Sequence, residues 1–355
     1  MKKFFLFTIL AIQVTFAQGT FKSEEINYWN QADSVHIFGT LTMPENGSMF
    51  PAAILITGSG TQDRDETILG HKPFKVIAEY LTNNGIAVLR VDDRGAGKTT
   101  LGKNIKTVTS ENFAEDVKSG IKYLKTRNEI NHKKIGLIGH SEGGMIASMV
   151  AAQSQDISFI VSLAGTGVSG EVVLQKQLTM PIESIPNFST TFKQKYALYI
   201  ASVLNAYKQA ETQTVAVLLL DKITKNWKDS LSSEEAKYAS NLANVYYTLK
   251  NMASDWGRFF IKFDPKTAIS KVKCPILVLN GSKDHQVFPE ENLAGIEEGL
   301  RMAKNKHYKI IKLEGLNHLF QHAATGLPQE YVKIKEDFAP EALQIMGDWL
   351  IKINK

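Results

Sequence analysis

The stretch KKIGLIGHSEGGMIASMVAAQ, residues 133–153, contains the feature that decides the fold. Its first half is apolar enough for a buried strand, its second half is rich in helix-forming residues, and the two halves meet at GHSEG. A tight turn from strand to helix needs strained backbone angles and close contact between the two elements, which favours glycine on both sides of its centre. Gly139 and Gly143 meet this requirement around Ser141. The pentapeptide alone also fits a turn whose serine caps the following helix.

The segments on either side of this turn alternate between strand-like and helix-like patterns. Apolar runs predict strands within 34–44, 51–60, 86–97, 134–140, 157–165, 275–284 and 307–318. Helical periodicity predicts helices within 74–85, 110–127, 142–153, 290–304 and 340–353. Such alternation implies an α/β fold, with a mostly parallel, doubly wound sheet and helices on both of its faces.

The alternation stops between residues 168 and 264. This block contains helical stretches such as FKQKYALYIASVLNAYKQ and SEEAKYASNLANVYYTLKNM, but no convincing buried strand. We interpret it as an inserted helical lid, so that residues 18–167 form the first part of the α/β core and residues 265–355 form the second part.

The N-terminus predicts export. Residues 1–17, MKKFFLFTILAIQVTFA, contain two lysines, an apolar run and a small residue at the expected cleavage after Ala17, which is typical of a secretory signal peptide. A buried helix or a membrane anchor is the alternative, but the apolar run is too short to span a bilayer of about 30 Å comfortably. We therefore expect an exported protein, periplasmic or extracellular, with no stable membrane insertion after removal of the signal.

Composition argues against several other classes of function. The formal net charge is +5 and the basic residues are scattered, so no nucleic-acid partner is expected. Asp92 and Asp93 begin a glycine-rich loop that lacks the spacing of a phosphate-binding loop, and no complementary His/Asp cluster accompanies them. We expect no metal and no cofactor. The only cysteine, Cys274, cannot form an internal disulfide, and we interpret it as a small buried residue rather than a nucleophile.

Two further residues extend the pattern around Ser141. Asp284 and His318 each follow a predicted strand, and active groups gather outside the carboxyl ends of the strands in open α/β sheets. The other histidines nearby are weaker candidates, because His322 lies further into the next segment and His285 adjoins Asp284 in sequence. The chain order serine, acid, histidine is the one expected of this fold.

The chain resembles the α/β-hydrolase superfamily from about residue 33 to residue 353. It is most similar to a bacterial secreted esterase-like branch, near dienelactone-hydrolase-like and serine-aminopeptidase-like members. This resemblance implies the α/β-hydrolase fold with an inserted helical lid. The motifs that carry it are TGSGTQDRD (57–65), RVDDRGAGKT (90–99), GHSEGG (139–144), LNGSKDHQV (279–287) and GLNHLF (315–320).

The resemblance also implies the roles of the three candidate catalytic residues. Ser141 would be the nucleophile, and His318 would act first as general base and then as general acid. Asp284 would be the carboxylate that orients the imidazole. No member of the triad is missing from this chain.

The oxyanion hole is implied in the same way. One donor would be the backbone N–H of Glu142, which directly follows the nucleophile. The other would come from the loop after the strand at 51–57, which starts Thr57-Gly58 here and His-Gly in many relatives. We choose Ser59 over Gly60 as this second donor.

The sequence is compatible with two roles for each of two further groups of residues. The segment QDRDE, residues 62–66, either contacts substrate or braces its loop through Arg64 and local aspartates. Large side chains of the lid either line an acyl or aromatic pocket or pack the lid onto the core; they are Met180, Ile185, Phe188, Tyr207, Trp256 and Phe259.

These features together predict a secreted serine hydrolase that cleaves carboxylic esters through an acyl-enzyme. Its expected substrate is a small-molecule ester or a short peptide. A serine aminopeptidase-like peptidase and an acyltransferase are the alternatives among enzymes. A binding protein that has kept the fold and lost catalysis is the alternative from another class.

Overall fold

The computed structural model describes residues 21–103, 107–183 and 185–355. The predicted signal peptide, residues 1–17, lies outside the described residues. Within the described part of the chain, no helix is both long enough and apolar enough to cross a membrane.

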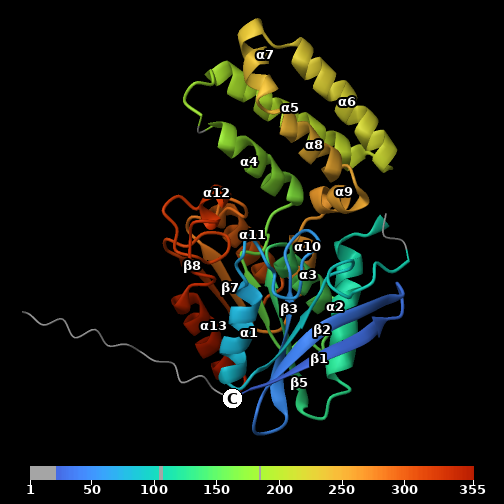
Figure 1. Ribbon diagram of the computed structural model, residues 1–355, viewed down its shortest axis with the longest axis vertical. Coiled ribbons are helices and arrows are strands. Elements are labelled where there is room, and N and C mark those ends of the chain that lie inside the picture. The colour runs from blue at the N-terminus through green and yellow to red at the C-terminus, as the bar shows by residue number, and fades with distance from the viewer. Residues whose placement is uncertain (1–20, 104–106, 184) are drawn as a thin grey trace, which may run out of the picture.

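An eight-stranded sheet forms the centre of the protein (Figure 1). Its strand order is β1-β2-β4-β3-β5-β6-β7-β8, and β2 runs antiparallel to both of its neighbours, whereas the other neighbouring pairs are parallel. This confirms the predicted mostly parallel sheet. The strands are β1 (Phe21–Asn30), β2 (Val35–Pro44), β3 (Phe50–Ile56), β4 (Ala87–Val91), β5 (Ile130–His140), β6 (Ile160–Leu163), β7 (Ile276–Gly281) and β8 (Tyr308–Leu313).

The edge strand β1 was not among the predicted strands. It pairs with β2 along its whole length, from Phe21 opposite Pro44 to Asn30 opposite Val35. Only Ile26 and Asn30 of this strand are buried, because it lies at the sheet edge and is covered poorly. A strand of this kind lacks the continuous apolar run that marks the central strands.

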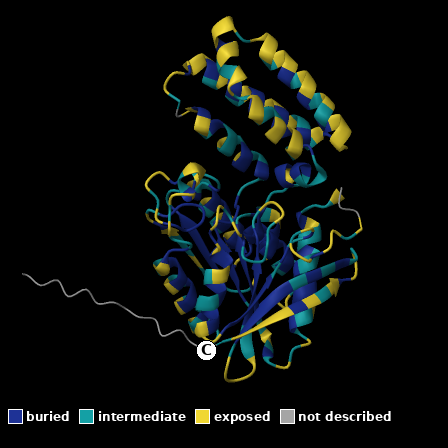
Figure 2. Cartoon of the chain, in the orientation of Figure 1, coloured by how far each residue is buried: buried dark blue, intermediate teal, exposed yellow. Residues whose placement is uncertain are grey.

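Two layers of helices cover the sheet because its strands are apolar on both faces. In β3, Ile54 and Ile56 pack on the side of α2 and α3, whereas Ala53 and Leu55 pack on the side of α1 and α13. Figure 2 shows the resulting core, with buried strands between helices that are exposed on their outer faces. The helices of the core are α1 (Pro73–Asn83), α2 (Ser110–Leu124), α3 (Glu142–Ala151), α10 (Lys266–Ile269), α11 (Pro289–Met302), α12 (Pro328–Tyr331) and α13 (Pro340–Ile353).

Seven helices separate β6 from β7, and all of them except α10 lie above the carboxyl ends of the strands (Figure 1). They have a hydrophobic core of their own, centred on large aromatic side chains such as Phe192 and Tyr207. Serine and threonine N-caps, among them Ser189 and Thr212, begin several of these helices. The six helices are α4 (Gly170–Glu183), α5 (Thr190–Gln209), α6 (Gln213–Asp229), α7 (Ser233–Ser240), α8 (Ala243–Met252) and α9 (Asp255–Lys262).

Candidate active site

Ser141 lies at the tight turn between β5 and α3. Its backbone angles are φ 55° and ψ −120°, a conformation that L-residues rarely adopt and that presents the side chain outside the helix. The flanking glycines permit this turn. A Cβ on Gly139 would lie 2.1 Å from the carbonyl oxygen of Gly143, and a Cβ on Gly143 would lie 2.1 Å from that of Ile56. The two glycines therefore allow the strand and the helix to touch.

His318 and Asp284 come together at the ends of β8 and β7. Nδ1 of His318 lies 2.8 Å from Oδ2 of Asp284, and both residues are buried. The other carboxylate oxygen accepts the N–H groups of Gln286 and Val287, each at 2.8 Å. Because a carboxylate accepts at Nδ1, the proton of the neutral ring lies on Nδ1 and Nε2 is left unprotonated.

A pocket of about 350 Å³ contains both Ser141 and His318 in its lining. Helices α4, α8 and α9 contribute to its walls together with the loops at the carboxyl ends of the strands. The lining is mostly apolar, and none of its described residues is lysine or arginine. Its apolar residues are Ile68, Leu69, Val173, Leu174, Met252, Trp256, Phe260, Val287, Leu319 and Pro328.

The loop after β3 lies beside Ser141. The N–H of Gly58 donates to Oε1 of Glu66 at 2.6 Å, so it is already engaged. The N–H groups of Ser59 and Glu142 donate to no acceptor among the described residues, and Glu142 opens α3, where N–H groups have no partner within the helix. Ser59 lines the pocket of Ser141, whereas Gly60 lines a neighbouring cavity. Glu142 lines that neighbouring cavity as well, and the choice of Ser59 over Gly60 as the second oxyanion donor stays a prediction.

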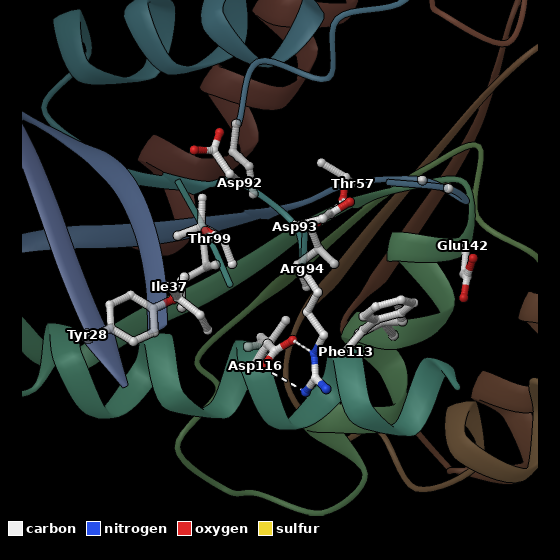
Figure 3. A pocket seen from close by; sticks show the side chains of 18 residues that line it. Tyr28, Ile37, Thr57, Asp92, Asp93, Arg94, Thr99, Phe113, Asp116 and Glu142 are labelled. Atoms are coloured by element: carbon white, nitrogen blue, oxygen red, sulfur yellow. Dashed lines mark hydrogen bonds and ion pairs between the residues drawn. The ribbon is translucent and has the colours of Figure 1, made fainter. Parts of the chain in front are cut away.

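A carboxyl group holds each of three successive residues in this loop; those of Glu66 and Glu142 are buried and that of Asp93 is half-buried. Thr57 Oγ1 donates to Asp93 at 2.8 Å, Gly58 donates to Glu66 as described, and Ser59 Oγ donates to Glu142 at 2.7 Å. Figure 3 shows Thr57 beside Asp93, with Glu142 at the start of its helix. Sequence reasoning considered Glu142 only for its backbone, and it did not predict that the three acids would converge.

Burial shifts two of these acids toward the neutral form. It raises the pKa of Asp93 to about 8, because hydrogen bonds from Thr57 and Gln62 offset the loss of solvation only in part. Burial also raises the pKa of Glu142, which accepts hydrogen bonds only from neutral donors. Asp93 and Glu142 thus have no cationic partner among the described residues, whereas Glu66 faces His140.

His140 connects this loop to His318. Its Nδ1 lies 2.9 Å from Oε1 of Glu66 and its Nε2 lies 2.9 Å from the carbonyl oxygen of His318. The two imidazole rings are 4.6 Å apart between centroids. Burial alone would lower the pKa of His140, but the neighbouring Glu66 carboxylate outweighs it and the net shift is upward. Both ring nitrogens face acceptors, so His140 links the Glu66 side chain to the backbone at His318.

The lid residues singled out in the sequence divide between the two expected roles. Trp256 lines the pocket of Ser141, whereas Phe188 and Tyr207 are buried in the core of the lid. Phe259 stacks on Phe263, and its neighbour in sequence, Phe260, lines the pocket instead. Met180 lines a separate cavity, and Ile185 packs against the lid core.

The remaining polar residues have structural partners. Arg64 forms ion pairs with Asp92 at 2.8 Å and with Glu25 at 2.7 Å, so it braces its loop through residues outside 62–66, the segment in which a partner was expected. No group of three or more His, Cys, Asp or Glu side chains among the described residues could hold a metal ion. Burial raises the pKa of Cys274 to about 12, which leaves the thiol unreactive.

The fold and the turn at Ser141 agree with the family to which this chain belongs, the serine aminopeptidase S33 family, whose model matches residues 72–322. The chain is 27% identical over 319 residues to esterase EstD of Thermotoga maritima. This alignment covers 88% of this chain and 65% of that protein. It is 24% identical over 207 residues to the mitochondrial acyl-coenzyme A thioesterase 2 of Mus musculus, over 55% of this chain and 42% of that protein. The chain thus spans less than two thirds of the length of either relative.

Solved structures support the fold independently. An esterase from Pyrococcus furiosus matches with a TM-score of 0.56 at 15% identity, over 94% of this chain and 91% of that chain. The α/β hydrolase GrgF from a Penicillium species matches with a TM-score of 0.56 at 16% identity, over 94% of this chain and 98% of that chain. These likenesses confirm the α/β-hydrolase fold.

Proposed function

We propose that this protein is a serine hydrolase that cleaves small, uncharged carboxylic esters through an acyl-enzyme formed on Ser141. The observation that carries the proposal is one pocket that contains both Ser141 and His318, with His318 bound through Nδ1 to the buried Asp284. A strained serine at a strand-to-helix turn and an oriented imidazole are the parts that nucleophilic acyl transfer requires.

The reaction follows from these groups. Nε2 of His318 takes the hydroxyl proton while Oγ of Ser141 attacks the ester carbonyl carbon. The tetrahedral oxyanion accepts hydrogen bonds from the N–H groups of Ser59 and Glu142. The bond to the leaving alcohol then breaks as the imidazolium returns its proton to the alcohol oxygen. A water molecule attacks the acyl-enzyme by the same route, releases the carboxylic acid and restores Ser141.

The lining of the pocket favours an uncharged substrate. A carboxylate or phosphate group near Ser141 would call for a lysine or arginine, and none of the described lining residues supplies one. Apolar side chains from the lid, such as Leu174, Trp256 and Phe260, suit a short acyl or aryl group. A coenzyme A thioester is therefore a weaker candidate than a neutral ester, although acyl-coenzyme A thioesterases are among the relatives.

A peptidase is the second candidate, because the chain belongs to a family described as serine aminopeptidase. An aminopeptidase must bind the protonated α-amino group of its substrate, a task suited to a free carboxylate. Glu142 is buried with both carboxylate oxygens hydrogen-bonded to the protein. Glu66 is also buried, but it lines the pocket, and its Oε2 has no hydrogen-bond partner among the described residues. Glu66 is therefore the residue that would receive the amino group of a peptide substrate, and parallel assays on esters and aminoacyl amides distinguish the two activities. An acyltransferase would share the acyl-enzyme and differ only in the acceptor.

Export is a further part of the proposal. It rests on the signal-like sequence of residues 1–17, and it would place the enzyme in the periplasm or outside the cell. Detection of a mature protein that begins at Gln18 in the exported fraction would support it, whereas an uncleaved protein in the cytoplasm would contradict it.

A substrate panel on the purified mature protein tests the function. We expect the highest kcat/KM on uncharged p-nitrophenyl esters of short acids, lower values on acyl-coenzyme A, and the lowest on aminoacyl p-nitroanilides. Ser141→Ala serves as the control and should remove all of these activities. A higher kcat/KM on an aminoacyl anilide would assign a peptidase. No turnover of any substrate, together with no labelling by a fluorophosphonate that reacts with activated serines, would favour a binding protein.

A further inference from the structure

The carboxylate of Glu142 binds three segments of the chain at once. Its Oε2 accepts a hydrogen bond from Ser59 Oγ at 2.7 Å. Its Oε1 accepts from Ser110 Oγ at 2.6 Å and from Trp256 Nε1 at 2.9 Å. Ser59 belongs to the loop after β3, called the oxyanion loop below because it would supply an oxyanion donor. Ser110 begins α2, and Trp256 belongs to α9 of the lid. Segments of the core and of the lid thus bind the same side chain.

An ionised carboxylate suits this position for a chemical reason. The indole N–H of Trp256 can only donate, and the hydroxyls of Ser59 and Ser110 are oriented to donate as well. A carboxylate has only acceptor oxygens and can satisfy all three donors. Burying it is costly, because only 2% of the residue is exposed and no described cation is paired with it. A group kept at that cost directly after Ser141 calls for a function.

The position of Glu142 in the chain indicates that function. Its backbone N–H is one expected oxyanion donor, and its side chain holds Ser59, which supplies the other. The spacing between the two donors therefore depends on one residue. Trp256 lines the substrate pocket and stacks on Phe260 of the same helix at 5.6 Å, so the third bond of the carboxylate depends on where α9 lies.

We propose that the Glu142 carboxylate is a positioning residue that couples the lid to the oxyanion hole. When α9 lies against α3, Trp256 and Ser110 fix one carboxylate oxygen and the other oxygen aims Ser59 at the reacting carbonyl. When α9 withdraws, the carboxylate loses a bond and Ser59 loses its fixed orientation. The inference deepens the proposed function, on which it rests, because it concerns the donors for the same oxyanion.

Trp256→Phe tests the coupling, because phenylalanine can keep the stacking on Phe260 while it removes the indole N–H. Loss of one such bond corresponds to a fall of about 3- to 10-fold in kcat on a short p-nitrophenyl ester.

The same substitution is then made in Glu142→Ala, which keeps the backbone N–H and by itself should lower kcat by about 10- to 100-fold. In that background Trp256→Phe should lower kcat by a clearly smaller factor than it does in the wild type. An effect of Trp256 on KM through substrate contact should persist in both backgrounds.

A second background covers the case in which Glu142→Ala folds poorly. Ser59→Ala removes the hydrogen bond between the Ser59 hydroxyl and the Glu142 carboxylate, and it leaves the buried carboxylate in place. Trp256→Phe should again have a clearly smaller effect on kcat than in the wild type. Glu142→Gln should restore most of the activity lost in Glu142→Ala, because its amide oxygen can accept from Trp256 and its amide nitrogen can donate to Ser59. Circular dichroism and melting temperature establish that each variant is folded.

Tyr207→Phe is the matched control in the lid. The Tyr207 hydroxyl donates a buried 2.7 Å hydrogen bond to the carbonyl of Leu249 within the lid and is not among the three donors to Glu142. Its loss should leave kcat unchanged. Equal effects of Trp256→Phe in all backgrounds would overturn the coupling and leave the Ser141 mechanism intact. Retained turnover in Ser141→Ala would instead overturn the proposed function itself.

Discussion

Nδ1 of His318 lies 2.8 Å from Oδ2 of Asp284, a residue 34 positions earlier in the chain. The parallel pairing of β7 with β8 creates this contact, because it brings the carboxyl ends of the two strands to one edge of the sheet. N–H groups of the following loop hold the second oxygen of Asp284, so the carboxylate has little freedom to turn. The imidazole is thereby fixed with Nε2 available to the pocket.

Asp284→Asn tests this relationship. The amide keeps the size of the side chain but cannot serve as an anionic acceptor for the imidazole, so the wrong tautomer is favoured and the imidazolium is no longer stabilised. We expect kcat on an ester to fall by about 10³- to 10⁴-fold, with a much smaller change in KM. Steady-state kinetics with matched melting temperatures would check this. A variant within tenfold of the wild type would mean that Asp284 does not orient His318.

Gly143→Ala tests the close contact at the turn. A Cβ at this position would lie 2.1 Å from the carbonyl oxygen of Ile56, the last residue of β3 before the oxyanion loop. The helix and the loop must separate to admit it, so we expect a lower melting temperature and a large loss of kcat. Ser148→Ala is a control on a buried position of the same helix and should be mild. A fully active Gly143→Ala would show that the turn tolerates more space than this geometry allows.

Asp93→Asn tests the acid beneath the oxyanion loop. The folded-state pKa of Asp93 is raised to about 8, from an ordinary value of 3.8. Between those pH values the folded state keeps a proton that the unfolded state loses, so the free energy of unfolding falls as pH rises, by up to about 1.4 kcal/mol per pH unit. Asparagine lacks this titration. The stability of Asp93→Asn relative to the wild type should therefore increase from pH 4 to pH 8 and then level off.

Unfolding by denaturant at several pH values would measure this difference. A difference that stays constant from pH 5 to pH 8 would mean that Asp93 is ionised in the folded protein throughout that range.

The thiol of Cys274 should not react with alkylating reagents in the native protein. Its pKa is raised to about 12 by burial, and the thiolate is the reactive form of cysteine. We expect iodoacetamide at pH 8 to leave the native protein unmodified and fully active, and to alkylate the thiol only after unfolding. Mass spectrometry of the two samples checks this. Rapid labelling of the native enzyme with loss of activity would point to a role for the thiol that this account does not include.

Much of the fold could be predicted because its central elements carry strong local signals. Buried parallel strands are continuous apolar runs, and the glycines around Ser141 mark a contact that no larger residue permits. The edge strand β1 was missed because most of its residues face solvent. Its assignment depends on pairing with β2, which local sequence does not reveal.

The candidate site was predictable only in part. Ser141, Asp284 and His318 are marked by their place after strands, which topology converts into proximity. The acids that hold Thr57, Gly58 and Ser59 come from three different segments, and no local pattern indicates that they converge. The same holds for the lid, where neighbouring aromatic residues face either the pocket or the lid core according to tertiary packing.

The central claim is that Ser141 is the nucleophile that His318 activates. A fluorophosphonate probe, which reacts with activated serines, followed by peptide mapping of the mature protein, measures this most directly. We predict one labelled residue, Ser141, with labelling abolished in Ser141→Ala and strongly slowed in His318→Ala. Labelling of another residue, or a His318→Ala variant that reacts as fast as the wild type, would contradict the account.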